Sequence, residues 1–270
     1  DIRRFVMANP MYGQNKADTK IDALIDKKNV WTFDRPPIVM DDGVLGGAYA
    51  VPAGGDKTIH LHNYPSGSGS LYALQLCAWN QVAQDIDGPA ITSTGMDYEN
   101  ENDDDDGVSW VMSYPGSKGI ADVDSFTVGT KAFYTKLKFS IADVSVLDDC
   151  AFGFRMKSEA AETNFDDFSD VASLNVISGD INVESILNNA ATVTTDTTDN
   201  WGDGETHTLE VRISASGVAS YYLDGRAVTT SPTSDVTFDS GDVFTPFMFF
   251  LHASNAACAV VLQELETGLL

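Results

Sequence analysis

Cysteine is scarce in this chain, which has only 3 in 270 residues: Cys77, Cys150 and Cys258. They lie far apart, each within an apolar or alternating run. An odd and sparse set argues against a disulfide framework. We therefore expect the protein to fold in a reducing cell, with each thiol acting as a small core residue.

Basic residues are also few, because 16 Lys and Arg stand against 40 Asp and Glu, for a formal net charge of −24. Such a field repels phosphate backbones and anionic lipids, so we expect neither nucleic acid nor a membrane as a partner. No apolar run approaches the ~20 residues that span a bilayer. The N-terminal residues lack the charged-then-apolar order of a signal peptide, so we expect synthesis in the cytoplasm without Sec export.

The common catalytic motifs are missing as well. The sequence contains no Gly-x-Ser-x-Gly, no cysteine beside a histidine and no Gly-x-x-x-x-Gly-Lys. His60 and His62 share one face of an expected strand at 58–62, but no third or fourth metal ligand is identifiable near them. We therefore expect a protein that is not an enzyme.

What the sequence does contain is strand pattern, most regular from Trp201 onward. Thr208, Glu210 and Arg212 alternate with apolar residues, which predicts a strand with one buried face. Turns at 216–217 and 224–225 make the next strands a β-meander. The apolar run 247–251 predicts a strand covered on both faces, and we expect the last strand, 257–265, to pair back onto it.

The middle of the chain continues this pattern. Residues 131–142 alternate, with a slip between Tyr134 and Leu137 that predicts a bulge, and 150–156 is the expected pairing partner. Residues 157–170 predict a surface loop with one helical turn. Residues 172–178 and 180–187 predict a hairpin around Gly179, and the Thr-rich run 192–198 predicts an edge strand or a loop.

The turn at Trp201, the HTLEV and YYLDG strands and the two apolar strands that follow resemble the concanavalin A-like lectin/glucanase family, which includes laminin-G-like sandwiches. The resemblance implies an all-β fold, a two-sheet antiparallel jelly-roll sandwich. Such sandwiches host lectins, hydrolases and structural modules, so the fold does not choose a function. Glycosidases of this fold carry a pattern near Glu-x-Asp-x-x-Glu, and neither Glu99 with Glu101 nor Glu264 with Glu266 completes it.

The most biased segment is DYENENDDDDG at 97–107. Dense carboxylates favour two interpretations, a solvated self-repelling loop or a Ca²⁺ or Mg²⁺ site formed by Asp97, Asp103 and Asp105. No other cofactor is expected. The family resemblance implies a sugar site built from loop acids and an aromatic platform, and it has two versions here. One joins Asp97, Asp103 and Asp105 to Tyr98 or Trp110, and the other joins Asp199 and Asn200 to Trp201.

Residues 1–28 differ from the rest and predict an extended N-terminal arm, followed by a single sandwich domain at 29–270. Apolar residues without a regular period follow a basic pair, and 17–28 has the spacing of a short amphipathic helix. Two interpretations remain, an arm that binds another protein and a leader that docks on its own domain. The expected partner-binding residues are Arg3, Arg4, Phe5, Met11, Tyr12, Ile21 and Leu24.

From Met7, the sequence MANPMYGQNKAD resembles the N-termini of virion structural proteins of marine tailed phages, particularly podoviruses of cyanobacteria. This resemblance implies a virion protein made in the host cytoplasm. We predict a capsid decoration or cement protein that contacts the major capsid protein and other virion subunits, as a homo-oligomer on the virion. The alternative is a carbohydrate-binding module of a tail fibre or head appendage.

Overall fold

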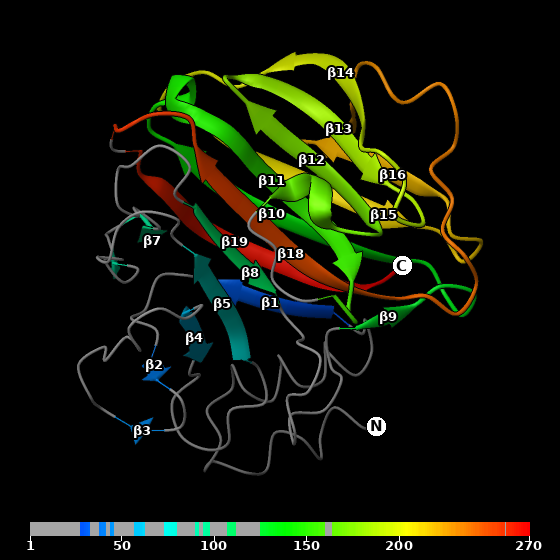
Figure 1. The fold of residues 1–270 in the computed structure, drawn as a ribbon, viewed down its shortest axis with the longest axis horizontal. Helices are drawn as coiled ribbons and strands as arrows, with labels where there is room; N and C mark the ends of the chain where they lie inside the picture. Colours follow the sequence, from blue (N-terminus) through cyan, green and yellow to red (C-terminus); the bar gives the residue numbers. More distant parts are fainter. Residues whose placement is uncertain are drawn as a thin grey trace, which may run out of the picture.

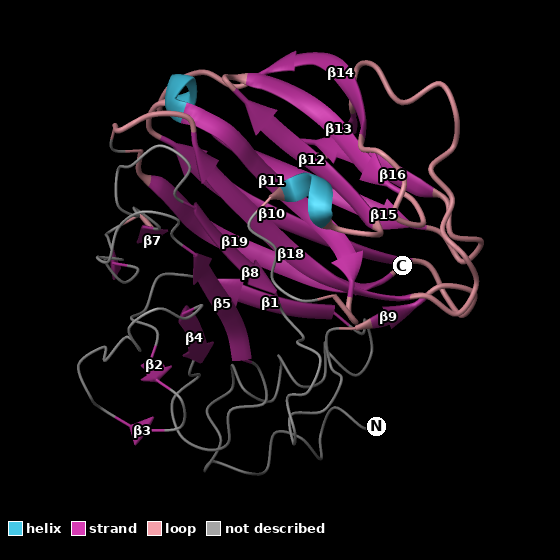
Figure 2. Ribbon diagram, in the orientation of Figure 1, coloured by secondary structure: helices cyan, strands magenta, loops and turns pink. Residues whose placement is uncertain are grey.

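The computed structural model describes residues 28–32, 38–41, 44–45, 57–62, 73–79, 90–91, 94–97, 107–111, 125–159, 164–256 and 258–270. They form two antiparallel β-sheets stacked as a sandwich (Figure 1). The helical elements of these residues are two 3₁₀ turns, η1 (Val144–Val146) and η2 (Phe165–Asp167) (Figure 2). None of these residues belongs to a helix long and apolar enough to cross a membrane. The expected all-β, two-sheet antiparallel sandwich is confirmed.

The first sheet, sheet A, has eight strands in the order β17-β16-β15-β10-β19-β7-β6, and β1 also pairs with β19. The meander expected from the sequence is therefore present as β15, β16 and β17. Lys28, which the sequence pattern places at the end of a helix, instead begins a strand. The bounds are β1 (Lys28–Thr32), β6 (Ala90–Ile91), β7 (Met96–Asp97), β10 (Phe133–Ile141), β15 (Thr206–Ile213), β16 (Ala219–Leu223), β17 (Arg226–Ala227) and β19 (Val260–Leu269).

The second sheet, sheet B, has eleven strands in the order β14-β13-β12-β11-β18-β8-β5-β4-β2-β3, with β9 also paired to β18. The hairpin around Gly179 is confirmed, and the Thr-rich run is the edge strand β14. The bounds are β2 (Ile38–Asp41), β3 (Val44–Leu45), β4 (Lys57–His62), β5 (Ala73–Trp79), β8 (Gly107–Val111), β9 (Phe126–Thr127), β11 (Leu147–Met156), β12 (Val171–Ile177), β13 (Asp180–Ile186), β14 (Val193–Asn200) and β18 (Val243–His252).

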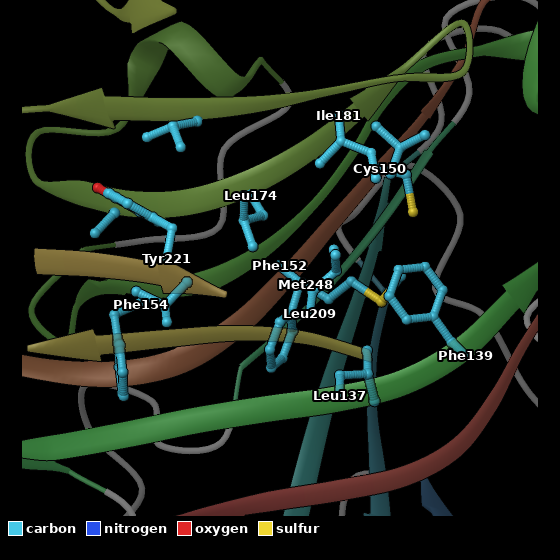
Figure 3. Close-up of a cluster of buried hydrophobic side chains, with 14 of the residues drawn as sticks. Leu137, Phe139, Cys150, Phe152, Phe154, Leu174, Ile181, Leu209, Tyr221 and Met248 are labelled. Carbon is cyan, nitrogen blue, oxygen red and sulfur yellow. The ribbon is translucent and has the colours of Figure 1, made fainter. Parts of the chain in front are cut away.

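The main core lies between the two sheets. Side chains from both sheets meet there, including Leu137, Phe139 and Leu209 from sheet A and Phe152 and Met248 from sheet B (Figure 3). Because strand side chains alternate between faces, each of these strands also presents a second row of side chains on the outer face of its sheet. The folded sandwich therefore fixes the positions of the side chains on its two outer faces.

Two pairing predictions and one predicted bulge are wrong. β10 pairs with β15 and β19 rather than with β11, and β18 pairs with β11 and β8 rather than with β19. In both cases consecutive strands lie in opposite sheets, because their apolar faces meet across the core. The bulge predicted between Tyr134 and Leu137 is absent, since Tyr134 points outward, and the register shift falls at Lys138/Phe139 in the pairing with β19.

Candidate functional site

The outer face of sheet A carries opposite charges in adjacent strands. Lys136 of β10 lies opposite Glu210 of β15 on one side and Glu266 of β19 on the other, and its Nζ is 3.2 Å from Glu266 Oε2. Lys138 lies opposite Glu264 of β19 and Thr208 of β15. Together with Arg212, the strands β10, β15 and β19 place three cationic and three acidic side chains on this face, so the charge of these three strands is balanced there, in a chain of net −24.

Aromatic side chains complete this face. The Arg212 guanidinium lies 3.9 Å from the centroid of the Tyr222 ring, and its Nε donates to Glu210 Oε1 at 2.7 Å. The Tyr134 hydroxyl donates to Glu266. Lys138 is exposed, whereas Tyr222 and Arg212 are partly exposed. Tyr222 and Arg212 belong to residue types that are enriched at protein interfaces, whereas the Lys and Glu side chains of this face belong to types that are depleted there.

The outer face of sheet B has a different polar group, a pair of carboxylates joined by one amide. Asn175 Nδ2 on β12 donates to Asp149 Oδ1 on β11 at 2.5 Å and to Glu184 Oε2 on β13 at 2.7 Å. Its Oδ1 accepts from the Cys150 backbone N–H at 2.8 Å, which fixes the orientation of the amide. Thr194 of β14 donates to Glu184 Oε1 at 2.9 Å, so the network crosses four strands.

Burial decides the charge state of this pair. Burial raises the pKa of Asp149 to about 6. The hydrogen bond from Asn175 lowers this pKa but offsets only part of the effect of burial. Burial also raises the pKa of Glu184, although Asn175 and Thr194 donate to it. Asn175 is fully buried and Glu184 is 5% exposed. The pair therefore binds a proton more readily than surface carboxylates do, and Glu184 is closed to a large substrate whereas Asp149 is partly exposed.

Next to the carboxylates, an aromatic cluster covers the same face. Phe165 and Phe168, at η2, pack against Phe249 and Phe247 of β18, with ring centroids 5.8 and 5.6 Å apart. Residues 157–170 were expected to be a surface loop, and its helical turn is confirmed. The two phenyl rings are buried, however, so η2 seals part of sheet B.

A polar anchor holds the end of this cover. Glu159 Oε1 accepts from the backbone N–H groups of Ser169 and Asp170, at 2.7 and 3.1 Å. Arg155 Nη1 lies 3.8 Å from Glu159 Oε2, and its guanidinium carbon lies 5.3 Å from the centroid of the Phe168 ring. Burial is the largest influence on the Glu159 carboxyl and raises its pKa. This anchor fastens residues 164–170 to β11.

At one end of the sandwich, a histidine lies between two acids. His207 Nδ1 is 2.7 Å from Asp224 Oδ2, and Nε2 is 3.2 Å from Glu205 Oε2. Partial burial lowers the pKa of His207, but the two carboxylates outweigh it, so the net shift is upward. Trp201 packs edge-on against the imidazole and donates its indole N–H to the Glu205 carbonyl. This arrangement fixes the turn before β15 to the turn after β16.

The second version of the predicted sugar site does not form. Trp201 is only 2% exposed and packs against Phe139, so it cannot serve as a platform for a sugar ring. Asp199 accepts from Arg226 Nη2, Thr229 N and Thr229 Oγ1, each at 2.8 Å. These bonds join edge strand β14 of sheet B to β17 of sheet A and to the segment that follows it, which is a structural role.

The other predicted sites lie largely outside the described residues. This holds for Arg3, Arg4, Phe5, Met11, Tyr12, Ile21 and Leu24 of the arm and for Asp103 and Asp105 of the acidic stretch. Asp97 is partly exposed at the end of β7. Within the described part of the chain, no group of three or more His, Cys, Asp or Glu side chains could hold a metal ion. Cys150 and Cys258 are buried free thiols, as expected.

Sequence reasoning missed the network of Asp149, Asn175 and Glu184. A signal was present, because Ser173 and Asn175 alternate with apolar residues in VASLNVI, and Asn182 and Glu184 do so in DINVESI. Alternation placed these polar groups on one face of a predicted hairpin. It did not indicate that η2 and the neighbouring strands would bury them.

No family model matches this chain, and no curated protein matches it. Several solved structures have a similar course of the backbone. The Emp47p carbohydrate recognition domain is 10% identical, with a TM-score of 0.48, 72% of this chain covered and 88% of that one. An alginate lyase from Pseudomonas aeruginosa is 12% identical, with a TM-score of 0.47 and coverages of 69% and 88%. A protein of unknown function from Shewanella oneidensis MR-1 is 11% identical, with a TM-score of 0.48 and coverages of 79% and 87%.

Proposed function

We propose that this chain is a non-enzymatic binding module of a virion, which decorates or cements a capsid through its N-terminal arm and the outer face of sheet A. The observation that carries this proposal is the position of β1. Lys28, the last residue of the predicted arm, pairs with Gly268 of β19. The arm sequence therefore joins the sandwich in the same sheet as the charge-balanced face.

Charge supports this choice of surface. A body of net −24 repels other acidic proteins over most approaches, whereas a face with paired charges does not. Tyr222 and Arg212 add planar groups that can pack against a partner, and the basic pair Arg3 and Arg4 can meet acidic residues of a shell. Many copies on a symmetric surface would add these contacts through avidity.

We propose no catalytic role because of the environment of two carboxylates, Asp149 and Glu184. Asp149 and Glu184 have raised pKa values, as catalytic acids often do, but both are engaged by Asn175. Glu184 is almost completely buried. We therefore assign this pair a role within the fold rather than in a reaction.

Cosedimentation with empty capsids that lack this protein tests the proposal. The full chain should bind saturably, and a chain without residues 1–27 should lose most of its binding while keeping the same circular dichroism spectrum. Lys138→Glu should weaken binding, because it adds negative charge to the outer face of sheet A. Lys157→Glu, which makes the same charge change after β11 of sheet B, is the matched control. Equal binding by all four proteins, or no binding by any, would reject the proposal.

The second candidate is a carbohydrate-binding module of a tail fibre or head appendage. It is favoured by the density of carboxylates in the acidic stretch, which follows β7 of sheet A and precedes β8 of sheet B in the sequence. A glycan array with and without Ca²⁺ tests this candidate. Ca²⁺-dependent binding that Asp103→Asn and Asp105→Asn together abolish would favour it over the capsid role.

A further inference from the structure

The carboxylate pair on sheet B lies next to a third acid on the cover. Asp166 belongs to η2, and Thr192 donates a hydrogen bond to its side chain. Its charge acts on both Asp149 and Glu184 and opposes their ionisation. Asp148 adds a fourth negative charge near Asp149. Two strands, β11 and β13, and η2 therefore place like charges in one small region.

The neighbouring elements offer this group hydrogen bonds but little opposite charge. β12 contributes the neutral Asn175 and β14 contributes Thr194. β18 places Leu251 opposite Asp149, and its His252 packs on Phe250 in the core instead. The charges that act on Asp149 are those of Glu184, Asp148 and Asp166, all of one sign.

We infer that Asp149 and Glu184 form a proton-linked switch that sets how firmly η2 covers the outer face of sheet B. When both carboxylates are ionised, they repel Asp166 and oppose the packing of Phe165 and Phe168. When the pair takes up a proton, the repulsion falls and the hydrogen bonds to Asn175 persist. The cover is then held by its aromatic contacts without an opposing charge.

The direction of the pH dependence follows from the raised pKa of Asp149, about 6. The closed cover binds the proton more tightly than an open one, in which water would solvate the carboxylates. By linkage, lowering the pH favours the closed cover, and raising the pH through about 6 weakens it. The face beneath η2, with Phe247 and Phe249, is therefore most accessible in neutral to alkaline solution.

Hydrogen exchange of the full chain, followed by mass spectrometry, tests this inference. After correction for the intrinsic rates, protection of residues 164–168 should fall about fivefold between about pH 5 and about pH 8. Asp149→Asn keeps the size and the acceptor oxygen but cannot ionise, so its protection should be high and nearly independent of pH. Asp180→Asn, an exposed position on the neighbouring β13, should keep the wild-type dependence.

Two results would overturn the inference. One is a wild-type protection that does not change with pH, and the other is a full pH dependence that survives in Asp149→Asn. If Asp149→Asn does not fold, Glu184→Gln provides the same test from the other carboxylate. A pH dependence that both variants retain would assign the effect to other groups.

Discussion

The outer faces of the two sheets come from the same kind of alternating strand, yet they differ in what their polar residues do. On sheet A, Lys136 pairs with Glu266 and Arg212 pairs with Glu210, and the row is partly exposed. On sheet B, Asp149 and Glu184 have like charges and lie beside a cover of aromatic rings. Alternation therefore places polar residues outside the core, but pairing and cover decide whether they face a partner.

Removal of the aromatic contacts between η2 and sheet B should cause the largest loss of stability. Phe168→Ala removes a ring that is 1% exposed and contacts Phe247 and Phe249. We expect a loss of about 3–5 kcal/mol in the free energy of unfolding, measured by urea denaturation. Val193→Ala is the control, because Val193 is 57% exposed and its truncation should change little. A loss below about 1 kcal/mol for Phe168→Ala would mean that η2 does not pack as described.

The carboxylates on the same face should make stability depend on pH. Because the folded-state pKa of Asp149 is raised from 3.8 to about 6, the protonated form favours the folded state. Stability should therefore rise as the pH falls from about 7.5 to about 5, by on the order of 1 kcal/mol, and this rise should be absent in Asp149→Asn. Equilibrium denaturation of both proteins across this range measures the difference. Identical slopes for wild type and Asp149→Asn would contradict the assignment.

Loss of the hydrogen bonds that Asp199 accepts between the edges of the two sheets should have an intermediate effect on stability. Asp199→Ala removes the acceptor for Arg226 Nη2, Thr229 N and Thr229 Oγ1. The expected loss is about 1–3 kcal/mol in thermal or urea unfolding. Asp196→Ala, on the same strand but exposed, serves as the comparison. If both variants lose the same free energy of unfolding, the hydrogen bonds of Asp199 do not hold the two sheet edges together.

The charged row on sheet A should matter least for stability. Lys136→Gln breaks a partly exposed ion pair with Glu266, and such pairs contribute about 0–1 kcal/mol. We expect little change in urea unfolding. A loss of several kcal/mol would instead make this row a structural element like the network on sheet B.

The sequence predicted the alternation, the meander and the hairpin around Gly179, because these depend on neighbours in the chain. It failed where strands choose partners across the sandwich, as for β10 with β11 and for β18 with β19. An alternating strand fits either sheet, and packing across the core decides between them. The prediction of Trp201 as a sugar-binding platform failed because its burial depends on residues that are distant in the sequence. Only the fold shows that Phe139 and His207 pack against its ring.

Protein–protein contact through sheet A is the central claim, and lysine acetylation footprinting tests it most directly. The full chain is acetylated free and bound to empty capsids, and the labelling of each lysine is compared by mass spectrometry. We predict that Lys136 and Lys138 of β10 become protected on binding, while Lys157, after β11, is labelled equally in both states. Protection of Lys157 with unchanged Lys136 and Lys138, or no binding at all, would contradict the account.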